Sequence, residues 1–363
     1  MKRFEFNIRE LAGSMGDLGT LFPLVVGYIA ICGLDPAGLL IMMGIANIAT
    51  GIVYKLPMPI EPMKVIALTA IAQHWSPSMV YATGVATGLV WLVLAVSGLV
   101  DKMANLVPTS IVRAIQVTLG LLLAYESLKM LSTAWLMGIG AFIIILALKD
   151  NKYFPASIVL MLLGIVFMYV NNVVPEFESI HITVPGLAIF TIDEMWDGMV
   201  SAGFAQIPLT ATNAVIATAL LIKTYWPDSH VTEKHLSLNM GIMNLTLPLF
   251  GGMPLCHGAG GLAGQYSFGA RTGGANIIEG TIEILLGLFL ASSIAILFAN
   301  FPVYIIGAMM LYVGLKLVKD NHSACFGKEK VPFFVTIAVA LLSNMAVGFI
   351  AGLIIFYFMH KNK

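Results

Sequence analysis

The sequence LPMPIEPMK at residues 56–64 decides the fold, because three prolines within six residues cannot occupy the interior of a helix. Its first three residues return as MPL at 253–255, and MGIAN at 43–47 returns as MGIMN at 240–244, both at an offset of 197 residues (253 − 56 and 240 − 43). In each copy an apolar, helix-like stretch leads into a proline and a short broken segment. Interrupted apolar segments at matching positions of two halves are typical of a secondary transporter whose substrate site lies between the halves.

The composition is that of a chain whose natural solvent is lipid. Of the 363 residues, 59% are hydrophobic and 10% are charged, with a mean hydropathy of +0.92, whereas about 25% of residues in soluble proteins are charged. The formal net charge of zero gives no support to a nucleic-acid partner. Cys32, Cys256 and Cys325 are odd in number and lack metal-ligand spacing, so we expect no disulfide framework, no metal site and no cofactor. The amino-terminal MKRFEF lacks an apolar core and a cleavage site, so we expect no removable signal peptide.

The spacing of apolar stretches predicts an all-α polytopic membrane protein, because a helix needs about 20 apolar residues to cross the hydrocarbon layer. Counting the broken segments 56–74 and 253–269, each half has seven elements, so the second half enters from the opposite side as a 7+7 inverted repeat. We divide the chain into a first repeat (1–174), an extracytoplasmic connector (175–197) and a second repeat (198–363). The other spans are expected at 13–32, 37–54, 78–99, 107–130, 133–148, 155–174, 198–222, 236–250, 274–299, 303–318, 331–345 and 346–360.

The distribution of basic residues gives the orientation of this arrangement. Every Lys and Arg except Lys64 and Lys129 falls on one side, whereas the longest opposite stretch, 175–197, carries five acidic residues and no basic one. The positive-inside rule then places both termini in the cytoplasm. The sequence therefore predicts a multi-pass protein of the inner (cytoplasmic) membrane.

The two broken segments predict an anion site. Each has an extended start and runs into a helix too short to cross the bilayer, and Pro62 suits the first turn of such a helix. A helix start leaves unpaired N–H groups and about half a positive charge, so two starts that meet near the midplane would bind an anion. Glycines at 258, 260 and 261 would let the backbone approach the ligand closely. The alternative is that these prolines and glycines are ordinary kinks and packing residues of membrane helices.

Four stretches resemble the molybdate transporter family, a branch related to the sulphate permeases. They are GDLGTLFPL at 16–24, LPMPIEPMK at 56–64, QIPLTATNAV at 206–215 and MPLCHGAGGLAGQYSFGARTG at 253–273. The resemblance implies core and gate domains and uptake of a tetrahedral oxyanion, molybdate first, with sulphate and tungstate as neighbours. It also implies that no soluble regulatory domain follows the last span. Members of the family usually have Gln where this chain has Glu61, so the carboxylate indicates either proton coupling or a shifted substrate preference.

Several polar residues at membrane depth have both a functional and a structural interpretation. Asp17 and Glu61 are the candidates for carrying a coupling proton, although Asp17 also suits a helix cap. Gln206, Thr210 and Asn213 are spaced to share one helix face, where they would either face a substrate cavity or bond neighbouring helices.

Further residues near the broken segments carry the same ambiguity. Lys64 would neutralise the anion or Glu61, or extend toward the membrane surface. His257 would donate to oxyanion oxygens, titrate or cap a helix. Glu279 and Glu283, one turn apart, form either a proton relay or structural pairs with Arg271 or Lys316; Glu126 and Lys129 are expected to pair locally, and Cys256 to pack.

The leading interpretation is a secondary transporter that takes up a tetrahedral oxyanion by alternating access, with molybdate, sulphate or tungstate as substrate. Membrane lipid, protons and a second copy of the chain are its candidate partners. A nucleobase–proton symporter of the same fold and a passive anion channel are the alternatives. An enzyme is not expected, because neither a metal-binding His-Glu-x-x-His nor a nucleophile elbow is present, so no residue is assigned a catalytic role. The predicted substrate-binding residues are Met63, Lys64, Gln206, Thr210, His257, Gly258, Ala259, Gly260 and Gly261.

Overall fold

The computed structural model describes residues 4–16, 18–100, 107–148, 156–171, 182–321 and 329–361. The first half contains α1 (Ile8–Ser14), α2 (Leu18–Ala30), α3 (Pro36–Tyr54), β1 (Glu61–Pro62), α4 (Lys64–Ala72), α5 (Pro77–Ser97), α7 (Thr109–Leu131), α8 (Trp135–Leu148) and α9 (Ala156–Val170). The second half contains α10 (Ile192–Gly198), η1 (Met199–Gly203), α11 (Phe204–Thr210), η2 (Ala211–Ala217), α12 (Thr218–Tyr225), α13 (Glu233–Thr246), η3 (Leu247–Phe250), β2 (Leu255–Cys256), α14 (Ala259–Phe268), α15 (Gly274–Ala299), α16 (Val303–Asn321), α17 (Lys330–Leu342) and α18 (Met345–Lys361).

The helical membrane architecture is confirmed. Within the described residues, five helices are long and apolar enough to cross a membrane by length and composition, and several shorter apolar helices accompany them. A helix or a broken segment lies at each predicted span, and the total of fourteen elements stays a prediction. The five long helices are Pro36–Tyr54, Pro77–Ser97, Thr109–Leu131, Ile192–Tyr225 and Gly274–Ala299.

Two spans differ from their predicted form. The span expected at 13–32 corresponds to α2, and the short α1, which Asn7 caps, lies largely before it. The span expected at 198–222 begins earlier, at Ile192, inside the predicted connector, and its α-helical turns alternate with the π-helical η1 and η2. Apolar periodicity does not distinguish π turns from α turns, because both present alternating buried and exposed faces over so few residues.

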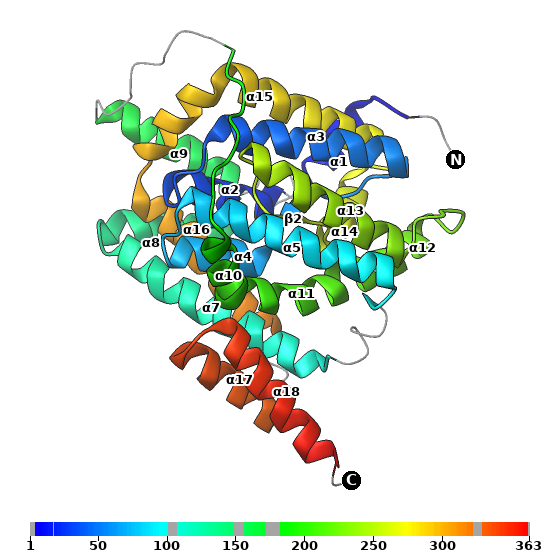
Figure 1. Ribbon diagram of the computed structural model, residues 1–363. Coiled ribbons are helices and arrows are strands. Elements are labelled where there is room, and N and C mark those ends of the chain that lie inside the picture. The colour runs from blue at the N-terminus through cyan, green and yellow to red at the C-terminus, as the bar shows by residue number, and fades with distance from the viewer. Residues whose placement is uncertain are drawn as a thin grey trace.

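Equivalent helices of the two halves make equivalent contacts with each other. The second element of the first half, α3, packs on the fourth element of the second half, α15; conversely, α13 packs on α5. The fifth elements of the two halves, α7 and α16, pack on each other. Figure 1 shows α3 lying along α15 at one edge and the terminal pair α17 and α18 at another. The same contacts recur when the halves are exchanged, as an internal repeat requires.

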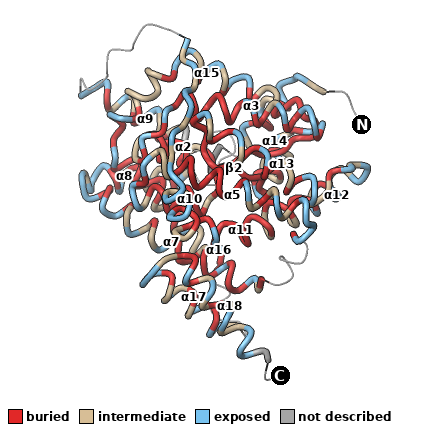
Figure 2. Tube along the Cα trace, in the orientation of Figure 1, coloured by how far each residue is buried: buried red, intermediate tan, exposed pale blue. Residues whose placement is uncertain are grey.

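Both broken segments lie inside the protein. Residues 56–63 and 251–258 are buried without interruption, and the region around β2 lies in the buried centre of the trace (Figure 2). A residue with a left-handed backbone lies at the entry to each segment, Lys55 at the end of α3 and Gly251 at the end of η3. Non-helical backbone at membrane depth is tolerated where protein surrounds it, so this burial explains how the chain can leave the helical conformation there.

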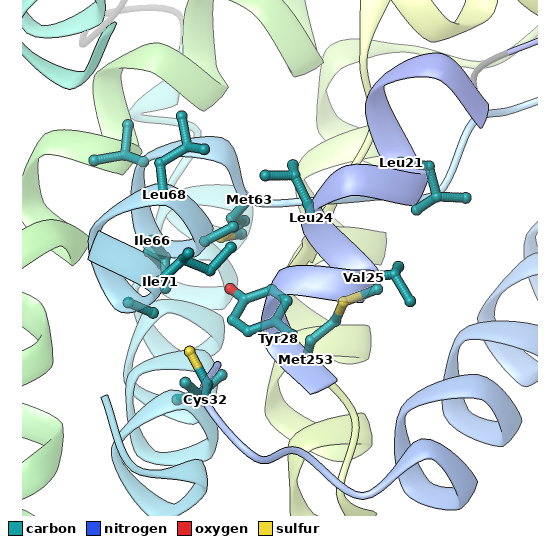
Figure 3. Close-up of a cluster of buried hydrophobic side chains, with 14 of the residues drawn as sticks. Leu21, Leu24, Val25, Tyr28, Cys32, Met63, Ile66, Leu68, Ile71 and Met253 are labelled. Carbon is teal, nitrogen blue, oxygen red and sulfur yellow. The ribbon is translucent and has the colours of Figure 1, made fainter. Parts of the chain in front are cut away.

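Helix α2 holds the first broken segment from one side. Figure 3 shows Tyr28 of α2 between Met63 at the start of α4, Ile71 of α4 and Met253 of the second broken segment. Tyr28 and Met63 are fully buried. The Tyr28 ring therefore belongs to the buried cluster that contains residues of both broken segments.

Candidate functional site

The two broken segments pair with each other. β1 and β2 form an antiparallel ladder with Glu61 opposite Cys256 and Pro62 opposite Leu255. The amide of Met63 extends the ladder by donating to the Pro254 carbonyl at 2.9 Å. Since α4 and α14 each follow one strand of this ladder, both half-helices have their amino ends at it. The prediction that two short helices direct their amino ends at a shared interior region is confirmed.

An asparagine clamps the second broken segment. Asn244 of α13 accepts from the Leu255 amide at 2.7 Å and donates to the Leu255 carbonyl at 2.6 Å. Asn244 is fully buried, so its side chain lies out of contact with solvent. The asparagine belongs to the repeated MGIMN motif, and that repetition was the sequence signal for a role that sequence reasoning did not assign.

The first broken segment is clamped in the same way by a residue of the other half. Asn276 of α15 accepts from the Met58 amide at 2.8 Å and donates to the Met58 carbonyl at 2.6 Å. Met58 is the repeat equivalent of Leu255, and Asn47 is the repeat equivalent of Asn244. Asn47 supports the clamp indirectly, because its side-chain oxygen accepts from Asn276 at 2.7 Å. No sequence signal marked Asn276.

The amino end of α4 is met by the glutamine predicted for the site. Gln206 of α11 accepts from the Val65 amide at 2.7 Å and donates to the Thr210 hydroxyl at 2.7 Å. Both side chains are buried and bonded to each other, so Gln206 and Thr210 share one helix face as predicted. The bond to Val65 joins α11 to α4, which is the contact between helices that the sequence left open as an alternative. Asn213 was expected on the same face; it lies in the π-helical η2 and is partly exposed.

The amino end of α14 is met by Glu61. A methyl group on Gly258 would lie 2.7 Å from one carboxylate oxygen, and one on Gly261 would contact the other oxygen. The Glu61 side chain is 2% exposed, and Lys64 at the first turn of α4 forms an ion pair with it at 3.2 Å. This ion pair confirms one of the two roles predicted for Lys64. The carboxylate therefore lies where the sequence predicted a bound anion.

The predicted residue His257 joins the two broken segments. Its Nδ1 lies 3.2 Å from the Pro59 carbonyl and its Nε2 lies 3.4 Å from the Asn239 side chain. The ring is fully buried and makes an edge contact with Tyr54. Both ring nitrogens thus have protein partners, which favours a structural role; the cap of α14 is formed by Gly258 without a side-chain bond. Asp17 lies outside the described residues.

The remaining predicted cradle residues occupy the first turn of α14. Ala259 is partly exposed and Gly260 is exposed, whereas Gly261 is buried against Pro59 and Glu61. A methyl group on Gly260 would have no neighbour within 4 Å. The open side of the turn is therefore at Ala259 and Gly260.

The other acidic pair lies away from the ladder. Glu279 and Glu283 of α15 line an otherwise apolar cavity of about 440 Å³ bordered by α1, α2, α3 and α9. The Glu283 carboxylate accepts a hydrogen bond from the side-chain amide of Asn47 at 2.9 Å, a partner that the sequence did not indicate. Glu126 pairs with Lys129 at 2.8 Å and Cys256 is buried, both as predicted. Among the described residues, no group of three or more His, Cys, Asp or Glu side chains could hold a metal ion.

Helices that pack in the same way in both halves, around two paired half-helices, define a membrane transporter of the inverted-repeat class. Its similarity to known proteins places it among anion transporters. A family model described as "Molybdate transporter of MFS superfamily" matches residues 9–123 and 198–317. Molybdate transporters 1 and 2 of Arabidopsis thaliana are 31% and 30% identical to this chain. The alignments cover 96% of this chain in both cases, and 87% and 86% of the respective relatives. The chain belongs to the molybdate transporter family, so it is a transporter and not an enzyme.

Solved structures share the fold. The transmembrane domain of BicA, a bicarbonate transporter of a cyanobacterium, matches with a TM-score of 0.70 at 15% identity, over 97% of this chain and 98% of that one. Murine Slc26a9, an anion transporter captured in the inward-facing state, matches with a TM-score of 0.75 at 12% identity, over 99% of this chain and 70% of that one. At these identities the likeness establishes the architecture alone.

Proposed function

We propose that this protein takes up a tetrahedral oxyanion across the membrane, with molybdate as the first candidate and sulphate and tungstate next. The observation that carries the proposal is the buried β1–β2 ladder with a half-helix amino end at each strand. Helix starts supply N–H donors and positive potential without a buried cation of full charge, which suits a dianion. The curated Arabidopsis relatives, named molybdate transporters, support molybdate over other oxyanions.

The anion cradle in this proposal is formed by backbone and by a few side chains. The amides at the start of α14, from Gly258 to Gly261, and the Lys64 ammonium donate to the oxyanion. Gln206 and Thr210 complete it from α11, where they already bond to each other beside α4. The amide of Met63 donates to Pro254 in the conformation described, so its part in the cradle requires the ladder to open there.

Transport proceeds by alternating access in this proposal. The half-helices move together with the core domain against the gate helices, so that the cradle faces each side of the membrane in turn. The finer predictions belong to the same proposal: an inner-membrane location with both termini cytoplasmic, assembly as a homodimer, and a coupling proton carried by Asp17 or Glu61.

The test is uptake of radioactive or mass-detected molybdate by proteoliposomes that contain the purified protein. Uptake driven above the external concentration by an inward proton gradient supports a coupled transporter. Flux that only equilibrates the anion supports a passive channel instead. Absence of uptake of molybdate, sulphate and tungstate under every gradient would refute the proposal.

Competition separates the oxyanion from the nucleobase alternative. The buried Glu61 carboxylate is the feature that favours a nucleobase, because a carboxylate can accept hydrogen bonds from a uracil-like edge. Excess sulphate or tungstate should reduce molybdate uptake, whereas excess uracil should leave it unchanged. Inhibition by uracil alone would replace the oxyanion by a nucleobase as the substrate class.

A further inference from the structure

The amino ends of both half-helices are met by side chains of this chain. At α4 the acceptor is the neutral Gln206, which bonds the Val65 amide. At α14 it is the charged Glu61, whose two oxygens lie against Gly258 and Gly261. Among the described residues, neither Glu61 oxygen accepts a hydrogen bond, although both are fully buried. A buried carboxylate held at a helix start without hydrogen bonds occupies the position of an anionic ligand but is not locked in it.

We propose that Glu61 is a tethered anion that competes with the transported oxyanion for the amino end of α14, and that Lys64 is shared between the two. This inference rests on the proposed function. When the oxyanion binds, the Lys64 ammonium exchanges its ion pair with Glu61 for one with the oxyanion. Glu61 then takes one proton from solvent and becomes a neutral carboxylic acid, while Lys64 keeps all its protons.

The exchange follows from the charges at the ladder. With Glu61 ionised, Lys64 balances one negative charge at 3.2 Å. A dianion in the first turn of α14 would bring two more negative charges within a few ångströms of that carboxylate, and like charges at such distances favour protonation of one partner. The side chain of Lys64 is 30% exposed, so its ammonium group can move from Glu61 to the bound oxyanion. The same partial exposure gives a proton from solvent access to Glu61.

The neighbouring groups leave Glu61 as the titrating residue in this exchange. The second broken segment contributes Cys256 and His257, α4 contributes Lys64, α2 contributes Tyr28 and α11 contributes the neutral Gln206. His257 is held by Pro59 and Asn239 through both ring nitrogens, so a proton on it would break one of these contacts. Cys256 is buried and contacts the Pro62 carbonyl through its sulfur.

Coupling of this kind is reciprocal, because a bound anion raises proton affinity by the same factor by which a bound proton raises anion affinity. We expect the affinity of the purified wild-type protein for molybdate to fall by about tenfold per pH unit over the pH range in which binding takes up one proton and molybdate stays a dianion. Binding in weakly buffered solution should also take up about one proton per anion, seen as a rise in pH.

The variant Glu61→Gln keeps the shape of the side chain but cannot titrate. It should bind molybdate with an affinity that no longer depends on pH, and more tightly than wild type at high pH, because the competing charge is gone. Glu126→Gln, which removes a carboxylate from the local pair on α7, is the matched control and should keep the wild-type pH dependence.

The outcomes separate the two proposals. Wild-type protein that binds molybdate without proton uptake overturns the tethered-anion inference and leaves the oxyanion transporter intact, and this result needs no variant to fold. An unchanged pH slope in Glu61→Gln overturns the inference in the same way. Wild-type protein that binds none of the three oxyanions overturns both.

Discussion

Replacing Asn244 by alanine removes both hydrogen bonds that hold Leu255 at the ladder. The lost bonds join the Leu255 amide and carbonyl to one side chain at 2.7 and 2.6 Å, all in the buried interior. A buried backbone group left without a partner costs about 1–3 kcal/mol. The two groups together therefore predict a loss of about 2–6 kcal/mol in unfolding free energy, toward the lower end where water enters the space.

The assay is thermal unfolding of the purified protein in detergent, read beside molybdate uptake in proteoliposomes. Asn300→Ala is the control, because the Asn300 side chain is exposed and bonds only the Ile296 carbonyl of its own helix. We expect Asn300→Ala to change stability by no more than about 0.5 kcal/mol. An Asn244→Ala protein as stable and as active as the Asn300→Ala protein would refute the clamp.

Three further predictions concern other contacts of the site and its supports. Gly261→Ala should destabilise the protein by about 1–3 kcal/mol through overpacking, because the new methyl group would meet Pro59 Cβ at 2.8 Å. Gly260→Ala has open space around the new methyl group and should stabilise the helix by up to about 1 kcal/mol. Equal melting temperatures of the two variants would contradict this prediction. Gln206→Leu should strand the Val65 amide and lower both stability and uptake, checked by melting and flux. Burial raises the pKa of Glu10, so the native state is favoured at low pH and loses this stability as pH rises from the ordinary Glu range through the raised pKa. Glu10→Gln should flatten the dependence of melting temperature on pH over that range.

The two broken segments could be predicted from the sequence, because what interrupts the helix there is a property of the local residues. Proline has no amide hydrogen and excludes the helical conformation from the residue before it, so Pro57, Pro59 and Pro62 interrupt the helix whatever surrounds them. The repeated MGIAN motif then placed a second interruption at 253–269, and the structure confirms both. Helix starts near a shared centre followed from the same reasoning.

The contacts of the site could not be predicted because they depend on which helices meet. Asn276 clamps Met58 from 218 residues away, and nothing in the local sequence distinguishes it from an asparagine that faces a neighbouring helix for other reasons. Glu61 was recognised as unusual beside an anion site, but its place against Gly258 and Gly261 depends on the register of a two-residue ladder. The π turns around Gln206 have no sequence pattern of their own.

The difference between the two asparagine clamps has a consequence for biosynthesis. Asn244 and Leu255 are 11 residues apart, so the carboxyl-terminal segment can assume its final form as soon as that short stretch has left the ribosome. Met58 has to wait for a partner made 218 residues later. We infer that the first broken segment enters the membrane without its clamp, which α15 supplies later. In a Met58→Cys variant, a nascent chain arrested before residue 276 would expose the cysteine at position 58 to a thiol-reactive label that the finished protein excludes.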